Sequence, residues 1–141
     1  MVIMFKKVIL PLLIIALVAA GAVYYYVFVY SVQNHRNIND EQAISIIADS
    51  LAQLFTNDEA VANTIYLNKV IDLKGVVIDT ASNQLGILTL TIGNVNNMSN
   101  VFITLSERPK LPIKLNDTIR VKGICSGFLS DVVINDATII E

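Results

Sequence analysis

The hydrophobic and polar positions divide the chain into three parts: a continuous apolar run, a stretch with helical spacing, and a series of short alternating runs. The apolar run covers Val8–Tyr30, 23 residues without a charge. As a helix it would span roughly 34 Å, slightly more than the ~30 Å hydrocarbon core of a bilayer. We therefore expect residues 8–30 to form a transmembrane anchor that follows a short N-terminal segment, residues 1–7.

The charges that flank this run predict its orientation. Lys6 and Lys7, together with the terminal amine, outweigh Arg36 on the other side. The positive-inside rule then places the N-terminus in the cytoplasm and residues 31–141 outside. Four tyrosines gather at the far end of the run, where aromatic side chains mark the lipid–water boundary: Tyr24, Tyr25, Tyr26 and Tyr30.

A cleaved signal peptide is the competing interpretation of the same segment. The small residues Ala20-Gly21-Ala22 have the spacing that a signal peptidase needs. Cleavage there would leave the apolar stretch Val23–Tyr30 exposed at a new N-terminus, so the uncleaved anchor is favoured. In both interpretations a polar spacer, residues 31–39, comes next.

Residues 40–66 have the periodicity of amphipathic helices. Asn39 and Gln42 occupy the positions of a helix cap and capping box, so we expect the first helix to begin near residue 40. A second pair with capping-box spacing, Thr56 and Glu59, predicts the start of a second helix. The apolar stripe of the first helix recurs at helical spacing: Ile44, Ile47, Ala48, Leu51, Leu54 and Phe55.

Residues 67–141 read as a barrel of five strands. The first strand, Tyr66–Asp79, contains Gly75, which indicates a bend. Its alternation predicts that Asp72 faces solvent. The other strands, one of them with a second bend at Gly123, are expected at Leu85–Ile92, Asn100–Leu105, Thr118–Cys125 and Val132–Ile140. The whole pattern predicts an N-terminal transmembrane helix followed by an α+β domain, with two short helices and a five-stranded Greek-key barrel of the OB type.

Composition narrows the range of functions. Residues 31–141 carry eight cationic and twelve acidic side chains, a formal charge of −4, which disfavours non-specific binding of nucleic acid. The single Cys125 and single His35 exclude an intramolecular disulfide and sites built from several cysteines or histidines. The sequence contains no nucleophile elbow, no HExxH motif and no phosphate-binding glycine loop. We therefore expect no catalytic activity, no cofactor and no metal site.

Two groups of residues carry a family resemblance. The first comprises Asp58-Glu59, Ala62-Asn63, Tyr66, Lys69-Val70-Ile71 and Gly75, and the second comprises Val121–Leu129 with Asp131-Val132-Val133. In these positions the chain resembles the bacterial tRNA-anti-like OB family over roughly residues 45–141. The resemblance implies an OB barrel in an envelope lipoprotein or membrane-anchored protein. Unlike such lipoproteins, this chain has no lipid-acceptor cysteine near its start.

Candidate contacts for a ligand follow from the way in which OB barrels bind. They use the face of the second and third strands and the loops at one rim. In this sequence Phe102 lies on that face, and the loops are Thr80–Gln84 and Ser126–Asp131. Phe128 and Leu129 in the second loop are either an exposed contact point or a cover for the end of the barrel.

A cationic stretch adds two further candidates. From Ser106 to Lys122 five cations stand against two acids, a charge of +3, and Arg120 and Lys122 lie on a predicted strand. Ordinary solvated charges explain the same pattern.

These observations predict a membrane-tethered OB module in the bacterial inner membrane, with its barrel in the periplasm. We expect it to bind an envelope protein, a glycan or a small ligand. The alternative function is binding of single-stranded nucleic acid, as anticodon-binding OB domains do, and the alternative location is secretion after cleavage. Nucleic acid is the less expected ligand because the domain is acidic and its predicted location lies outside the cytoplasm.

Overall fold

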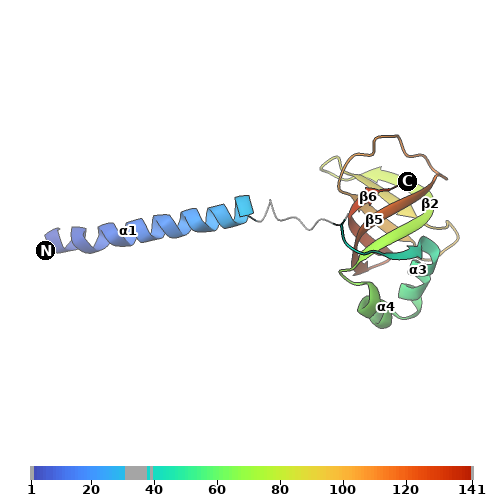
Figure 1. Cartoon of the computed structure of the whole chain (residues 1–141), viewed down its shortest axis with the longest axis horizontal. Helices are drawn as coiled ribbons and strands as arrows, with labels where there is room; N and C mark the ends of the chain where they lie inside the picture. The colour runs from blue at the N-terminus through green and yellow to red at the C-terminus, as the bar shows by residue number, and fades with distance from the viewer. Residues whose placement is uncertain (1, 31–37, 39, 141) are drawn as a thin grey trace. The chain divides into compact units, whose positions relative to one another are not determined.

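The N-terminal segment is helical, as its composition predicts. The computed structural model describes residues 2–30, 38 and 40–140, in two compact units, Met1–Asn37 and Ile38–Glu141. The first unit contains helix α1 (Val2–Tyr25), which continues as a π-helical turn, η1 (Tyr26–Tyr30) (Figure 1). Residues 11–28 have a mean hydropathy of 2.1 and, by length and composition, form a helix able to cross a membrane. Most of the predicted spacer, including the expected cap Asn39, lies outside the described residues.

Five strands of the second unit form the predicted closed barrel. They run in the order β2-β3-β4-β6-β5, and pairing of β2 with β5 completes the circle (Figure 1). Four neighbouring pairs are antiparallel, whereas β4 and β6 are parallel. The strands are β2 (Val70–Ser82), β3 (Leu88–Ile92), β4 (Val101–Leu105), β5 (Thr118–Phe128) and β6 (Val132–Ile139).

The long strand β2 takes part in both halves of the barrel. Its first part pairs with β5, where Gly75 lies opposite Ile119, and its second part, from Val77 on, pairs with β3, with a register shift between Val77 and Asp79. One bent strand thus serves two neighbours, as the glycine in its middle predicts.

The two glycines at the bends are required by close packing. A Cβ atom on Gly75 would lie 2.8 Å from the Cβ of Ala48, and one on Gly123 would lie 2.5 Å from Cγ2 of Ile134. Real carbon–carbon contacts are longer, about 3.5–4.0 Å. Both positions therefore exclude any side chain unless the neighbouring residue, Ala48 of α3 or Ile134 of β6, moves.

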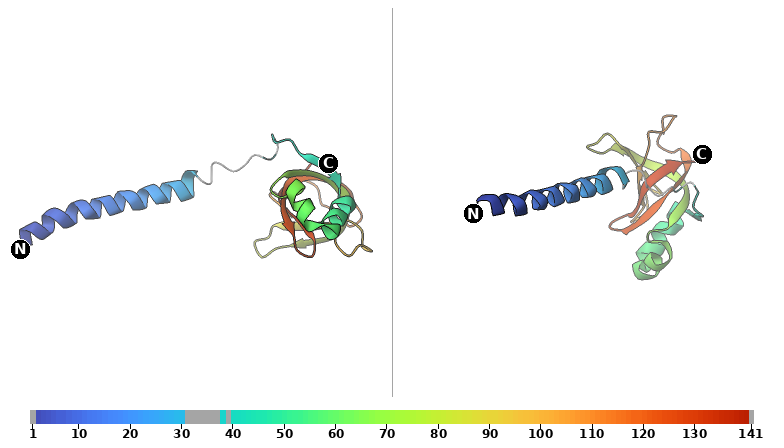
Figure 2. Two further views of the ribbon diagram at one scale, coloured as in Figure 1. Left: turned by 90° about the horizontal axis from the view of Figure 1, so that it is seen from below. Right: turned by 60° about the vertical axis from the view of Figure 1, so that its left-hand side comes forward.

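Two helices cover one end of the barrel, α3 (Ala48–Asn57) and α4 (Glu59–Tyr66) (Figure 2). Side chains alternate between the two faces of each strand, so every second residue, mostly apolar, points into the barrel. The buried side chains of the two helices pack against this apolar set. The largest fully buried side chains are Leu51, Phe55, Ile71, Leu73, Val77, Leu90, Ile92, Val101, Ile103, Val121, Val132 and Ile134. Helices and barrel thus share one core.

The prediction that the first helix begins near residue 40 is wrong. Residues Ile44–Ile47 form a strand, β1, that pairs in parallel with β2, and α3 begins only at Ala48. The sequence Ile-Ser-Ile-Ile also suits a strand, because β-branched residues favour it and Ser45 alternates with isoleucines. The segment fits both a helical and a strand pattern, and its pairing with β2 favours the strand. Residues 40–66, predicted as helical, therefore contain one strand followed by two helices.

The start of the second helix also differs from the prediction. Asp58, not Thr56, is the N-cap of α4, since its carboxylate accepts a hydrogen bond of 3.0 Å from the backbone N–H of Val61. Thr56 instead donates its hydroxyl to the carbonyl of Ala52 within α3. Tyr66, expected in the first barrel strand, is the last residue of α4.

Candidate functional site

The outer surface of β3 and β4 presents an aromatic side chain among uncharged neighbours. Phe102 on β4 is 37% exposed, because Val101 and Ile103 on either side point into the core. In the register of the sheet Phe102 lies opposite Thr91 on β3 and Val133 on β6. Thr104 follows two residues along β4 and is half-buried. We call Thr91, Phe102, Thr104 and Val133 the Phe102 face.

The two predicted rim loops lie at opposite ends of this face. The β5–β6 hairpin joins the start of β4, since the Asp131 carboxylate accepts a 2.7 Å hydrogen bond from the N–H of Asn100. The loop after Ser82 lies at the far end of β3, because Ser82 pairs with Leu88 whereas Val77 pairs with Ile92. The face therefore spans the barrel between the loops, and the loops do not form one rim.

Phe128 and Leu129 have different environments. The ring of Phe128 stacks on that of Phe55 at a centroid distance of 5.9 Å, and Phe55 is buried in the core. Phe128 therefore belongs to the cover of the barrel end, the second of its two predicted roles. Leu129, at the hairpin turn, is 83% exposed and available for contact.

Arg120 lies in a structural ion pair. Its Nε and Nη2 atoms donate to the two carboxylate oxygens of Asp72 at 2.8 and 2.6 Å, and the Ser45 hydroxyl donates to the same carboxylate at 3.1 Å. The prediction that Asp72 is a solvated strand residue is wrong: β1 and Arg120 cover it. Hydrogen bonding by Arg120 is the main cause that holds the pKa of Asp72 below its usual value. Burial opposes this effect, and Ser45 and the charge of Lys122 add to it.

Lys122 also contacts the segment that enters the domain. Its Nζ atom donates to the backbone carbonyl of Glu41 at 2.8 Å. Both cations project from β5, which β6 separates from β4. The structure thus does not bring Arg120 and Lys122 together with Phe102. These two contacts could not be predicted from the sequence, because Asp72 lies 48 positions from Arg120 and Glu41 lies 81 positions from Lys122.

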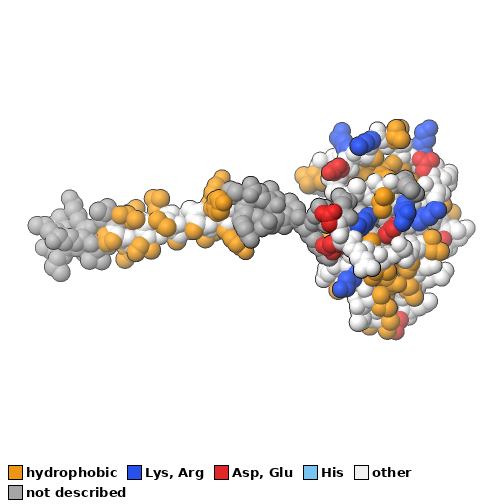
Figure 3. All heavy atoms as spheres, viewed as in Figure 1, with side chains coloured by type: hydrophobic (Ala, Val, Ile, Leu, Met, Phe, Trp, Pro, Cys, Tyr) orange, Lys and Arg blue, Asp and Glu red, His pale blue; other side chains and the backbone are white. Residues whose placement is uncertain are grey.

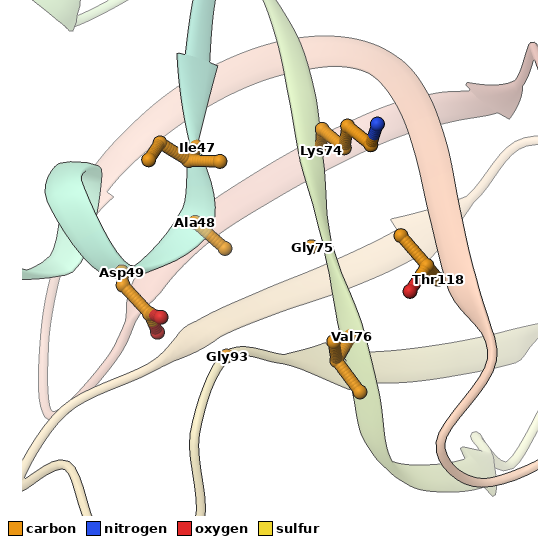
Figure 4. A pocket seen from close by; sticks show the side chains of 8 residues that line it. All are labelled: Ile47, Ala48, Asp49, Lys74, Gly75, Val76, Gly93 and Thr118. Carbon is orange, nitrogen blue, oxygen red and sulfur yellow. The ribbon is translucent and has the colours of Figure 1, made fainter.

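Two hollows lie on the described surface of the barrel domain. The smaller, of about 210 Å³, lies at the bend of β2, where Ala48 points toward Gly75 and the charged groups of Asp49 and Lys74 point apart (Figure 4). It is smaller than most ligand pockets. The larger, of about 590 Å³, lies between residues 107–113 and the ends of β5 and β6, with apolar walls and charges of both signs at its edge. Among residues 2–30, 38 and 40–140 no three His, Cys, Asp or Glu side chains gather in a metal-binding arrangement.

Comparison with known families agrees with the barrel. The model of the tRNA_anti-like family matches residues 1–138. The chain belongs to the tRNA_anti-like family. Among solved structures, it is similar to a lipoprotein of Klebsiella pneumoniae that is described, provisionally, as nucleic acid-binding. The TM-score is 0.52 at 13% identity, over 69% of this chain and 92% of that one, which supports a shared fold. No curated protein matches the chain.

Proposed function

We propose that this tRNA_anti-like protein is a membrane-tethered binding module outside the cytoplasm, and that it captures a neutral ligand on the Phe102 face without transforming it. The observation that carries the proposal is the environment of Phe102. A half-exposed phenyl ring beside Thr91, Thr104 and Val133 offers an apolar platform and hydroxyl groups, and the charged residue in this register is an acid, Asp79 on β2, opposite Thr91. Such a surface suits a glycan or an uncharged stretch of an envelope protein.

The apolar helix α1 supports the tethered arrangement. Residues 11–28 suffice to cross a bilayer, and Lys6 and Lys7 precede them, which favours a cytoplasmic N-terminus. The similarity to a lipoprotein is consistent with association with a membrane or the cell envelope. Tyr24, Tyr25 and Tyr26 at the end of the helix are exposed side chains that suit the bilayer boundary.

Single-stranded nucleic acid is the second candidate ligand, because the Klebsiella lipoprotein carries that description. Nucleic-acid-binding OB surfaces combine stacked aromatic side chains with cations along the strand path. Here the aromatic side chain lies on β4, whereas the two cations lie on β5. Arg120 is paired with Asp72, and Lys122 donates a hydrogen bond to the backbone carbonyl of Glu41. The geometry thus favours the neutral ligand.

Photo-crosslinking from the face tests both candidates. A photoreactive amino acid replaces Thr104 in the full-length protein in intact cells, and the same group at Lys74 on the outer side of β2 is the control. The proposal predicts protein or glycan adducts from position 104 that are absent from position 74. Nucleic-acid adducts from position 104 would support the second candidate, and equal adducts from both positions would contradict a specific face.

External protease tests the location separately. Sealed cells with an intact inner membrane and a permeabilised outer envelope should lose residues 40–140 to the protease. Full protection of this domain would overturn the proposed location without any bearing on which face binds.

A further inference from the structure

Helix α4 carries exposed aliphatic side chains that lie outside the hydrophobic core. Ala62 and Tyr66 on its inner side are buried in the core, whereas Val61 and Ile65 are 54% and 47% exposed. The latter two lie one turn apart, so they form a continuous apolar stripe. Figure 3 shows hydrophobic side chains gathered over the end of the domain that carries α4.

The stripe continues onto the residues that follow the helix. Leu67 is exposed, and its Cδ1 atom lies 3.6 Å from the place where Gly127 would carry a Cβ atom. The surface therefore reaches the β5–β6 hairpin, which ends in the exposed Leu129. We call Val61, Ile65 and Leu67 the α4 face.

Charges of opposite sign stand at the two ends of this face. Asp58 caps the start of α4 and shares the stripe with Val61 and Ile65, because positions i, i+3 and i+7 lie on one side of a helix. Lys69 is exposed just after the end of the helix. If two α4 helices pack antiparallel about a two-fold axis, Val61 of each copy meets Ile65 of the other. The same rotation brings each Asp58 close to the other Lys69.

We propose that the α4 face is a contact between two copies of this chain, in which Asp58 of one copy pairs with Lys69 of the other. The opposite charges of Asp58 and Lys69 at its two ends make the face self-complementary in charge, as a two-fold contact requires. Three aliphatic side chains cover less than a standard protein interface, so the contact is weak in dilute solution. The proposed membrane anchor would raise the effective concentration of neighbouring copies, and the fraction of copies in contact would rise with it.

Zero-length crosslinking tests the pairing directly. Full-length protein labelled with ¹⁵N is mixed with unlabelled protein in phosphatidylcholine vesicles and treated with a carbodiimide, which joins a carboxylate to an amine in contact. Within one copy the eight residues of α4 separate Asp58 from Lys69 by roughly 12 Å. A link between these two residues must therefore join different copies, and a mixed-isotope peptide identifies it.

The proposal predicts a mixed-isotope link between Asp58 and Lys69 that is lost in Ile65→Asp. Leu111→Asp, an equally drastic change at an exposed leucine outside the α4 face, should retain the link. No such link in the wild-type protein, or its survival in Ile65→Asp, would overturn the proposal.

A second variant guards against misfolding of Ile65→Asp. Lys69→Glu changes one exposed side chain and places like charges across the two-fold axis. Copies labelled at the N-terminus with a donor or an acceptor fluorophore are mixed in the same vesicles. The efficiency of fluorescence resonance energy transfer between them should be at least threefold lower in this variant than in the wild-type protein. Unchanged transfer would show association through the anchor alone and would overturn the proposal. None of these measurements depends on a ligand or on membrane orientation, so failure of the proposed function would remain a separate result.

Discussion

Arg120 on β5 and Asp72 on β2 form a two-pronged ion pair, with Nε–Oδ1 and Nη2–Oδ2 distances of 2.8 and 2.6 Å. The Asp72 side chain is 11% exposed and that of Arg120 is 41% exposed, so the pair lies at the edge of the solvent. Ser45 adds a hydrogen bond from β1. Three strands meet at one carboxylate, which links the entering segment of the chain to the barrel.

Replacement of this carboxylate should weaken the fold. Asp72→Asn keeps the size of the side chain but removes its charge and one of its two acceptor oxygens. Hydrogen bonds to charged groups contribute about 1.5–3 kcal/mol, and solvent around the 41% exposed Arg120 weakens this pair, so we expect the free energy of unfolding to fall by about 1–2 kcal/mol. Urea titration of residues 38–141 measures the change, with Asp79→Asn on the exposed part of β2 as the control. A loss as small as that of the control would contradict the structural role.

The same carboxylate predicts a pH dependence. The pKa of Asp72 is lower in the folded protein than its ordinary value of 3.8, so the unfolded chain binds a proton first as the pH falls. The stabilisation is complete above the unfolded pKa and is lost as the pH falls through the folded pKa. The difference in unfolding free energy between wild type and Asp72→Asn should therefore be constant from pH 7 to 5 and shrink below pH 4. A difference that persists unchanged at pH 2 would refute this linkage.

The glycines at the bends give a third prediction. Gly75→Ala and Gly123→Ala should each lower the free energy of unfolding by about 1–3 kcal/mol, because the new methyl group overlaps Ala48 or Ile134. Gly86→Ala is a suitable comparison: its φ of +74° disfavours alanine, but the nearest atom lies 3.9 Å away. Thermal unfolding should rank both bend variants below Gly86→Ala. The opposite order would show that the strands adjust to the methyl group.

The single thiol gives a fourth prediction. Cys125 is fully buried, and burial raises the pKa of its thiol, so the reactive thiolate is scarce at neutral pH. Native protein should react with a thiol reagent at pH 8 at least tenfold more slowly than protein unfolded in urea. Equal rates would contradict the burial of Cys125 and would show that its thiol can react in the folded protein.

The sequence predicted most of the barrel because its strands obey local rules. Leu88, Leu90 and Ile92 alternate with threonines, and Gly75 and Gly123 mark bends that packing requires. The strand β1 was missed because Ile44, Ile47 and Leu51 also repeat at helical spacing, and only pairing with β2 decides for a strand. Phe102 was predicted from alternation alone. The pairing of Arg120 with Asp72 was not, because it depends on the register between β2 and β5.

Phe128 and Phe102 should respond differently to truncation. Phe128→Ala removes a partly buried ring that stacks on Phe55 in the core. A fully buried phenylalanine loses about 3–5 kcal/mol on truncation, so we expect the free energy of unfolding to fall by about 2–3 kcal/mol here. Phe102 faces outward, so Phe102→Ala should change this free energy by less than about 1 kcal/mol. Chemical denaturation of the two variants tests the assignment. Similar losses in both would place Phe102 in the core and remove it from the binding face.

The most direct test of the binding function is the yield of photo-adducts from position 104 in intact cells, compared between Phe102 and Phe102→Ala. An aromatic contact of about 1 kcal/mol corresponds to a roughly fivefold change in affinity. The account predicts at least a fivefold lower yield in Phe102→Ala, an unchanged unfolding temperature, and a normal yield in the control Leu111→Ala. An equal yield with and without the Phe102 ring would contradict the proposal that this face captures the ligand.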